Sequence, residues 1–225
     1  MGLLEALQTR VLTADGAIGT LLYSYGLDYC HEEMNVTKRE IVQKIHEQYI
    51  AAGADVIQTN TYGANAIKLA RYGYEGRVKE FNEAAVKLAK AAAGNDVFVL
   101  GTIGGIRGIR KSDATLEEII QAIREQVQVL IDGDVDGILL ETFYDFEEIE
   151  AAVRVVRAIT TKPIIAQVSM HEPGALQGGI SFADALTALE KAGADIVGSN
   201  CRLGPFHTIQ AFEKVNLPEK AYLSA

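Results

Sequence analysis

The chain has 225 residues, of which 48% are apolar and 23% are charged, and its formal net charge is −9 at pH 7. This length can bury one large core or two small ones, and the composition is that of a globular protein rather than a disordered one. The negative charge, with no basic cluster to offset it, disfavours nucleic acid as a partner.

The apolar runs, the N-terminal residues and the cysteines indicate the cellular compartment that we expect for the protein. No apolar run reaches the roughly 18 residues of a transmembrane helix, and we expect no membrane partner. The first residues lack the basic region of a signal peptide. Cys30 and Cys201 are far apart in sequence, so we expect reduced thiols rather than a disulfide framework. Together these features predict a cytoplasmic protein.

Apolar runs of strand length alternate with segments of helical periodicity. Because the runs are apolar throughout, we expect a parallel sheet covered by helices. No linker interrupts the pattern, which predicts one domain over residues 1–225. The predicted strands lie at residues 10–15, 55–60, 97–102, 136–141, 163–169 and 195–200, and a seventh begins at 221–224.

Helix start signals precede four of the intervening segments. A hydroxyl or carboxylate side chain followed three residues later by a glutamate is the pattern of a capping box, and a lone serine can also cap a helix. The predicted starts are Thr37 with Glu40, Thr115 with Glu118, Asp145 with Glu148, and Ser181.

The regular spacing of these βα units favours a (β/α)8 barrel of the TIM type over a doubly wound sheet. Such a barrel needs eight strands, whereas this chain stops near the start of the seventh. We therefore expect a barrel that is truncated there, as a fragment of a longer protein. The alternative is an open α/β fold.

Three of the predicted strands share one sequence pattern, the strand cadence. In it, a Gly-Ala-Asp or similar turn leads into an apolar run that ends at a polar residue. The runs stop at Asn60, at Glu141, and at Asn200 followed by Cys201. Since parallel strands end at the same rim of a sheet, we expect these side chains to gather there. A carboxylate, two amides and a thiol at one rim have the composition of an active site.

The segments around Asn60 and Glu141 are the most polar of these strand ends. Thr59 and Asn60 belong to a run of amides and hydroxyls that needs hydrogen-bond partners if buried, which substrate, water or local turns could provide. Glu141 ends an apolar strand, where a charge is costly unless it is paired. A substrate ammonium would be a natural partner, and a salt bridge to a rim Arg or Lys is the alternative.

Asp15 and Cys201 are each ambiguous when taken alone. Asp15 precedes Gly16, and glycine there would let the backbone approach a ligand, but for the motif taken alone we favour a tight turn in which Asp15 caps a helix. Cys201 follows a predicted strand and could be a nucleophile or a metal ligand, although a lone cysteine is more often a small core residue. One cysteine is too few for a metal site.

Three further residues are interpreted as structural or as loop features. Arg107 follows the glycine-rich third strand end, which could cradle a phosphate but matches no nucleotide-binding fingerprint. We therefore favour a rim loop there. Cys30 is interpreted as structural, and His46 is expected to pack or cap within its helix.

In chain order, these motifs resemble the homocysteine-binding domain of homocysteine S-methyltransferases. The similarity rests on segments 15–20, 53–65, 140–143 and 198–205. The opening stretch through Gly26 is most similar to the N-terminal domain of bifunctional homocysteine S-methyltransferase/methylenetetrahydrofolate reductase. The resemblance implies a homocysteine-binding methyltransferase barrel, incomplete at its C-terminus.

The resemblance also implies residue roles. Asp15 and Glu141 match carboxylates near the homocysteine ammonium, and Asn200 matches an amide in the same pocket; we add Thr59 and Asn60 to the predicted substrate-binding residues. Family members hold zinc with three cysteines, of which Cys201 matches the first. The other two have no counterpart before residue 225. A complete zinc site therefore requires cysteines beyond this chain, and we expect weak or no zinc binding here.

The implied reaction transfers a methyl group to the zinc-activated thiolate of homocysteine, giving methionine. Methyltetrahydrofolate or S-methylmethionine is the expected donor, and the resemblance also points to a fused or partner methylenetetrahydrofolate reductase domain. No residue is assigned as catalytic, and this chain alone is expected to be inactive. Two alternatives stay open. One is a non-catalytic fragment, and the other is a barrel lyase, which is disfavoured because no predicted strand ends in lysine.

Overall fold

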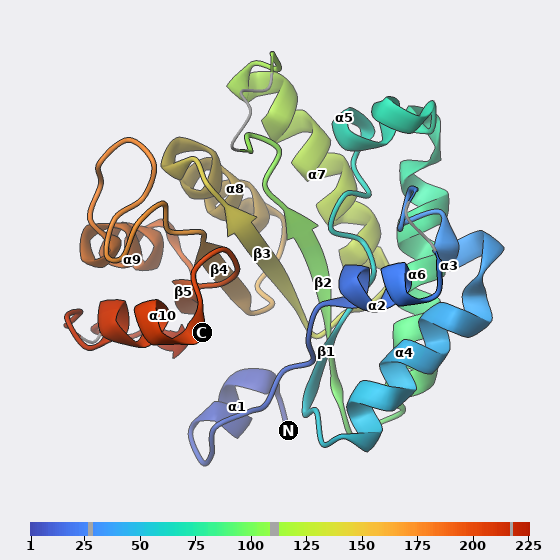
Figure 1. The fold of residues 1–225 in the computed structure, drawn as a ribbon, viewed down its shortest axis with the longest axis horizontal. Coiled ribbons are helices and arrows are strands. Elements are labelled where there is room, and N and C mark those ends of the chain that lie inside the picture. The colour runs from blue at the N-terminus through green and yellow to red at the C-terminus, as the bar shows by residue number, and fades with distance from the viewer. Residues whose placement is uncertain (27–28, 109–112, 217) are drawn as a thin grey trace. The chain divides into compact units, whose positions relative to one another are not determined.

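A computed structural model describes residues 1–26, 29–108, 113–216 and 218–225. These residues form two compact units. Unit 1 comprises Met1–Ile103 and Glu125–Ile138, and unit 2 comprises Gly104–Arg124 and Leu139–Ala225. Figure 1 labels the elements of both units, which are described in turn below. The single domain expected from the sequence stays a prediction.

Over the described residues, the sheet has six strands ordered β1-β2-β3-β4-β5-β6. The pairs β1–β2, β4–β5 and β5–β6 are parallel, with Ile196 of β5 opposite both Ile165 of β4 and Tyr222 of β6. This confirms an α/β fold whose parallel strands follow chain order, while closure into eight strands stays a prediction. The strands are β1 (Val56–Gln58), β2 (Phe98–Gly104), β3 (Gly137–Phe143), β4 (Ile164–Val168), β5 (Ile196–Ser199) and β6 (Tyr222–Ser224).

The strand predicted at residues 10–15 is wrong. Only Ala14 forms a bridge, to Val56. The backbone N–H of Thr13 donates to the Asp55 carboxylate at 2.9 Å rather than to a strand neighbour, so the ladder does not extend toward the N-terminus. Val11 is 89% exposed, which removes the burial that would have favoured a strand there.

Helices of unit 1 cover the strands through their apolar faces. Val42 and Ile45 of α4 and Phe81 and Ala85 of α6 are buried, and the two helices pack side by side (Figure 1). The helices and 3₁₀ turns are α1 (Leu3–Leu7), α2 (Ile18–Ser24), α3 (Met34–Thr37), α4 (Arg39–Ala51), α5 (Ala66–Leu69), η1 (Ala70–Tyr72), η2 (Glu75–Arg77) and α6 (Val78–Ala93). Helix α7 (Leu116–Asp132) contributes residues to both units.

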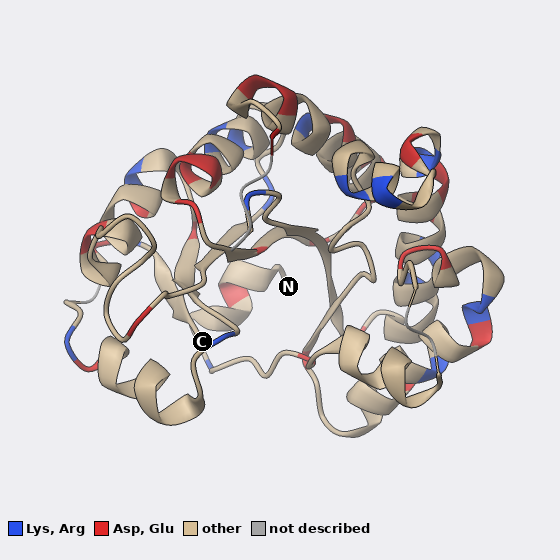
Figure 2. Ribbon diagram, turned by 45° about the horizontal axis from the view of Figure 1, so that its top comes forward, with Lys and Arg blue, Asp and Glu red and all other residues tan. Residues whose placement is uncertain are grey.

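The helices described in unit 2 besides α7 are α8 (Phe146–Ile159), α9 (Phe182–Ala192) and α10 (Pro205–Phe212). Helix α8 packs on β4 and on α9, and α9 packs on β5. Charged residues lie mainly on helices and loops, as Figure 2 shows, and the strands are largely apolar, as predicted. Within the described residues we find no helix that could traverse a bilayer.

Three of the four predicted helix caps are present. Thr115 and Glu118 form a reciprocal capping box, because each side chain accepts a hydrogen bond from the other residue's backbone N–H. Asp145 and Ser181 accept from the backbone N–H groups three residues ahead. The cap predicted at Thr37 is wrong, since Thr37 ends α3 and its hydroxyl donates to the Glu33 carbonyl at 3.2 Å.

The aspartate of the strand cadence has a structural role that the sequence pattern did not reveal. This aspartate precedes β1, β3 and β5. Each time, its carboxylate accepts a hydrogen bond from a backbone N–H of the neighbouring segment that comes earlier in the chain. Asp136 accepts from Val99 at 2.7 Å, and Asp195 accepts from Ile164 at 2.9 Å. With Asp55 and Thr13 the same contact is made at 2.9 Å. The repeated motif thus fixes the starts of the strands, opposite the ends that carry the candidate site.

Candidate functional site

A cluster of polar side chains lies in unit 2 where β3 and β5 end. Asn200 follows β5 directly, and Glu141 and Thr142 lie in the last half of β3. The Asn200 Nδ2 donates to Glu141 Oε2 at 3.0 Å and to Thr142 Oγ1 at 2.8 Å. Asn200 Oδ1 accepts from the Thr142 backbone N–H at 2.8 Å. The structure therefore brings Glu141 and Asn200 together, as the cadence predicted.

The backbone at the end of β3 is strained. Thr142 has φ = 57°, in the left-handed region that β-branched residues rarely adopt. Such a conformation costs about 1–3 kcal/mol and persists where the surroundings enforce it. Sequence reasoning missed Thr142, which is 8% exposed. The sequence feature that could have identified it is its hydroxyl, next to Glu141, the one charged residue of an otherwise apolar strand.

Cys201 lies beside Asn200 on the solvent side of this cluster. It is exposed, and both it and Arg202 have left-handed φ values, 64° and 59°. The turn is closed by the Leu203 N–H, which donates to the Cys201 carbonyl at 2.7 Å. The Arg202 guanidinium lies 6.0 Å from the ring centre of Tyr144, which begins the loop after β3.

The implied zinc site is not completed by the residues present. In the part of the chain that the structure describes, no three His, Cys, Asp or Glu side chains are grouped as metal ligands. Cys30 belongs to unit 1, where it is buried and its thiol donates to Glu32 Oε2 at 3.5 Å. Cys201 is thus a single predicted ligand, which does not fit the three-cysteine set.

Thr59 and Asn60 lie at the end of β1 in unit 1 and are bound by the protein itself. The Thr59 hydroxyl pairs with that of Thr61 at 2.6 Å and accepts from the Thr102 N–H at 3.0 Å. Asn60 Nδ2 donates to the His31 carbonyl at 2.7 Å and to Asn35 Oδ1 at 3.0 Å. The protein therefore supplies partners that the sequence analysis had offered to substrate or water. A substrate role for these two residues stays a prediction.

Asp15 is half-buried in unit 1, and its Oδ2 accepts from the Gln58 N–H at 2.9 Å, so it is tied to the end of β1. Gly16 packs closely against Tyr49, because a Cβ at this position would lie 2.8 Å from the Tyr49 hydroxyl oxygen and would displace that side chain. Asp15 and Glu141 belong to different units. Their convergence on one ligand stays a prediction.

Unit 2 also has a pocket of about 410 Å³ among its loops. Arg107 on its wall contacts Asp145 at 3.3 Å and Glu147 at 2.7 Å. These acidic partners, Glu147 first, raise the pKa of the Arg107 guanidinium. They also offset its charge, which weakens the phosphate interpretation of this loop. The pocket is lined by Arg107, Gly108, Ala114, Tyr144, Asp145, Gln177 and Gly178.

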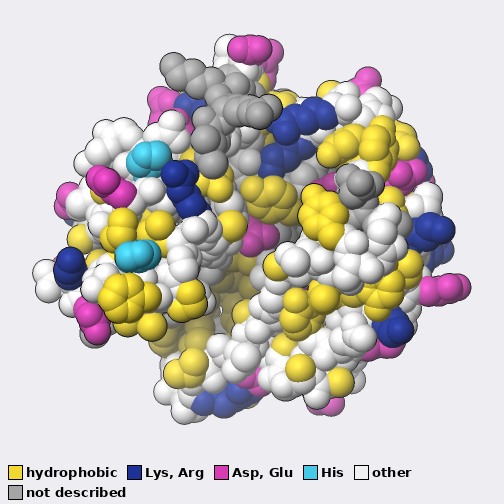
Figure 3. Space-filling view, in the orientation of Figure 1, with side chains coloured by type: hydrophobic (Ala, Val, Ile, Leu, Met, Phe, Trp, Pro, Cys, Tyr) yellow, Lys and Arg dark blue, Asp and Glu magenta, His cyan; other side chains and the backbone are white. Residues whose placement is uncertain are grey.

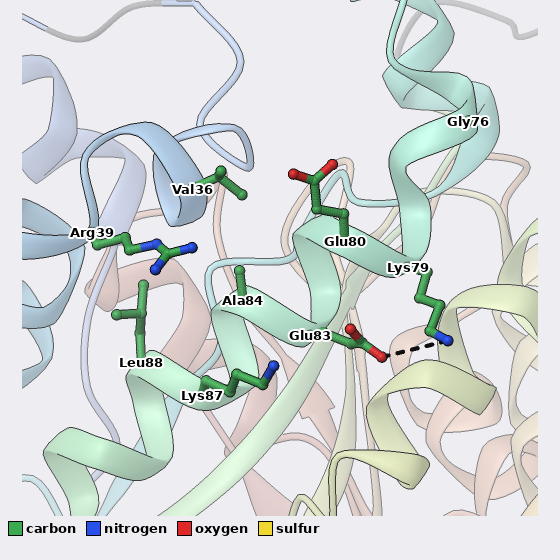
Figure 4. Close-up of a pocket in the computed structure, with 9 residues that line it drawn as sticks. All are labelled: Val36, Arg39, Gly76, Lys79, Glu80, Glu83, Ala84, Lys87 and Leu88. Atoms are coloured by element: carbon green, nitrogen blue, oxygen red, sulfur yellow. Dashed lines mark ion pairs between the residues drawn. The ribbon is translucent and has the colours of Figure 1, made fainter.

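A second pocket, of about 470 Å³, lies in unit 1 between α3, α4 and α6 (Figure 4). Its rim is charged, and Lys79 and Glu83 on α6 form an ion pair at 3.8 Å. Its lining residues come from helices and the η2 turn, and none of them is a strand-end residue. We therefore assign the candidate site to the β3–β5 cluster.

Comparison with known proteins gives the family. The chain matches the Homocysteine S-methyltransferase family over residues 12–225 and belongs to that family. It is 32% identical over 223 residues to methionine synthase of Mycobacterium tuberculosis, covering 90% of this chain and 19% of that protein. Methionine synthase of Mycobacterium leprae is 30% identical, with 18% of its length covered. The chain thus spans about a fifth of the length of these curated relatives.

Solved structures agree on the fold. The metallated form of the homocysteine methyltransferase MmuM from Escherichia coli has a TM-score of 0.81 at 22% identity, covering 93% of this chain and 81% of that one. DHDPS from Cyanidioschyzon merolae has a TM-score of 0.52 at 15% identity, covering 83% of this chain and 56% of that one. At these identities the likeness is one of fold alone.

Proposed function

We propose that this chain forms the homocysteine-binding part of a homocysteine S-methyltransferase, an enzyme that makes methionine. Family membership supports the reaction class. The single observation that carries the assignment to a site is the hydrogen-bonded Glu141–Asn200 pair at the strand ends, directly beside exposed Cys201.

The cluster suits an amino-acid substrate. Glu141 is partly exposed and carries a carboxylate that can accept from an ammonium group, and charge-assisted hydrogen bonds of this kind are among the strongest in proteins. Asn200 holds that carboxylate from the other side. Asp15 is proposed as a second carboxylate for the same ammonium. Binding the amino group in this way orients the homocysteine sulfur for transfer.

In the proposed reaction the sulfur of homocysteine loses its proton to solvent and attacks the methyl carbon of the donor. The new S–C bond forms as the bond between methyl and donor breaks, and the electron pair of that bond leaves with the donor. A free thiol has a pKa of about 8.5, so most of it is protonated at neutral pH and needs activation. The described residues supply one of the implied zinc cysteines, so no activation step is derived from zinc here.

The test has two parts. Calorimetry should detect L-homocysteine binding and much weaker binding of 4-mercaptobutanoate, which lacks the amino group. Glu141→Gln should weaken only the former, whereas Glu172→Gln, at an exposed glutamate of unit 2, serves as the matched control. Equal affinity for both thiols would refute the assignment of the amino-group site.

Methionine formation is measured separately with methyltetrahydrofolate and with S-methylmethionine, which identifies the donor. Zinc content of the purified chain is measured alongside, and tight stoichiometric zinc would contradict the expectation of a weak site. Homocysteine binding without turnover would favour the non-catalytic fragment. A Schiff-base lyase has less support, since none of the six described strands contains a lysine.

A further inference from the structure

We propose that Thr142 is a positioning residue that orients Asn200 and, through it, the Glu141 carboxylate toward the substrate's amino group. The inference rests on the proposed function and deepens it. It starts from the juxtaposition of the Thr142 backbone N–H, the Thr142 hydroxyl and the Glu141 carboxylate around a single amide side chain.

The backbone N–H of Thr142 sets which way the amide faces. An N–H can only donate, so it selects the Oδ1 of Asn200, which lies 2.8 Å away. The Nδ2 must then lie on the opposite side of the amide. That placement presents a donor to Glu141 Oε2 at 3.0 Å, whereas a flipped amide would set an oxygen against the carboxylate.

The Thr142 hydroxyl holds the same amide at a second point. Asn200 Nδ2 has two hydrogens, and its two acceptors, Glu141 Oε2 at 3.0 Å and Thr142 Oγ1 at 2.8 Å, account for both. The backbone N–H of Asn200 also donates to the Val168 carbonyl at 3.2 Å, which fixes the start of its side chain. The carboxylate is therefore held by an amide that cannot rotate without losing several contacts.

The backbone conformation argues that the hydroxyl is there for the site rather than for stability. Thr142 has φ = 57°, which glycine would adopt without strain. Glycine would keep the N–H but would remove the hydroxyl that accepts from Asn200. A threonine at this position thus gives up stability and retains an orienting contact.

The experiment compares Thr142→Ser, Thr142→Val and Thr142→Gly in the whole chain. For each we measure the thermal midpoint and the affinities for L-homocysteine and 4-mercaptobutanoate by calorimetry. The ratio of the two affinities reports recognition of the amino group. Thr187→Val, which removes an exposed hydroxyl from α9 in unit 2, is the matched control.

We expect the affinity ratio to fall about tenfold in the valine and glycine variants. This is the size expected for losing one hydrogen bond, here the bond from Asn200 to the Thr142 hydroxyl that orients the Glu141 carboxylate. The serine variant should stay close to wild type, because it keeps the hydroxyl. The glycine variant should unfold at or above the wild-type midpoint, which separates positioning from stability. Should the valine variant fail to fold, serine and glycine still decide the question.

The outcomes separate the two proposals. A wild-type chain that does not prefer L-homocysteine refutes the proposed function and, with it, this inference. A wild-type preference that survives unchanged in the glycine variant overturns the role of Thr142 alone. A loss of preference in serine as large as that in glycine would also overturn it, because the hydroxyl would then not be the orienting group.

Discussion

The strand ends of unit 1 and unit 2 carry similar residues in different environments. In unit 1, Thr59 and Asn60 are 2% and 6% exposed and their side chains bind other protein groups. In unit 2, Glu141 and Asn200 are partly exposed, next to a strained backbone and an exposed thiol. A polar residue at the end of a strand therefore cannot be assigned a ligand-binding or a structural role until its hydrogen-bond partners are known.

The unit 1 network extends well beyond the strand end. Gln126 of α7 is fully buried, and its Nε2 donates to the Thr61 carbonyl at 2.7 Å. Asn82 of α6 donates to the Ala64 carbonyl at 2.8 Å. These helix side chains satisfy backbone carbonyls of the buried segment that follows β1, and the Thr61 carbonyl also accepts from the Ala64 N–H at 3.0 Å. The segment is thus fixed without any ligand.

Exposed apolar residues also differ between elements. Phe206 and Ile209 of α10 in unit 2 are 67% and 58% exposed, and Figure 3 shows hydrophobic side chains over this helix. Helix α9 of the same unit instead buries its apolar face, including Phe182 and Leu189. The contrast places the least covered apolar surface of unit 2 on its last helix.

The largest expected difference between the units is in thiol reactivity. Burial, with a further contribution from Glu32, raises the pKa of the Cys30 thiol to about 12. Each pKa unit lowers the thiolate fraction about tenfold, so we expect buried Cys30 to react ~1,000-fold more slowly with a disulfide reagent than a thiol of ordinary pKa, and exposed Cys201 to be the thiol that labels first. Labelling kinetics of Cys201→Ser and Cys30→Ser check this. Rapid labelling of the folded Cys201→Ser variant, in which Cys30 is the remaining thiol, would contradict this prediction.

Next in size is the loss of a buried network contact. Asn60→Ala leaves the His31 carbonyl and Asn35 Oδ1 without the Asn60 donor, which should lower the free energy of unfolding by roughly 4 kcal/mol. Asn200→Ala, at a partly exposed position, should cost about 1 kcal/mol in stability. Denaturant unfolding of both variants measures the difference. Equal destabilisation would show that the two strand ends are alike.

A pH effect of slightly smaller size is expected from His46 in unit 1. It is fully buried, and neither ring nitrogen has a hydrogen-bond partner among the residues that the structure describes. Burial lowers its pKa to about 4, against a smaller opposing effect of Glu47. Below pH ~6.5 the unfolded state takes up a proton that the folded state does not. The free energy of unfolding should therefore fall by up to about 3 kcal/mol between pH ~6.5 and ~4.

The His46→Leu variant isolates this effect from the titrating carboxylates. Its unfolding free energy, measured by denaturant at several pH values, should lack the His46 contribution to the slope in that window. A variant as pH-dependent as the wild type would place the acid sensitivity elsewhere. No comparable dependence on this histidine is expected for substrate binding at the unit 2 cluster.

The smallest expected effect is on substrate affinity, and it tests whether the unit 2 cluster binds the amino group. Glu141→Gln keeps the size of the side chain and removes its charge, so L-homocysteine should bind about 10-fold more weakly while the thermal midpoint changes little. Calorimetry and thermal unfolding measure the two quantities. A large drop in the midpoint with unchanged affinity would assign Glu141 to the scaffold, as for Asn60.

Much of the fold followed from local patterns. The six strands from β1 to β6 and the caps at Thr115, Asp145 and Ser181 were predicted, because apolar runs and capping residues act over a few neighbouring positions. The errors at residues 10–15 and at Thr37 have a common cause. In both, a competing hydrogen bond occupies the group that the local pattern needed: the Thr13 N–H donates to the Asp55 carboxylate, and the Thr37 hydroxyl donates to the Glu33 carbonyl.

By itself the sequence determined the alternation of strands and helices, the family resemblance, and the placing of Glu141 and Asn200 at strand ends. Only the tertiary structure decided that Asn60 is held within a buried network while Asn200 holds a carboxylate beside solvent. The physical reason is that the hydrogen-bond partners of the Asn60 and Asn200 side chains lie 25 to 59 positions away in the chain. A linear pattern encodes the donor and the acceptor, but chain folding decides which of them meet.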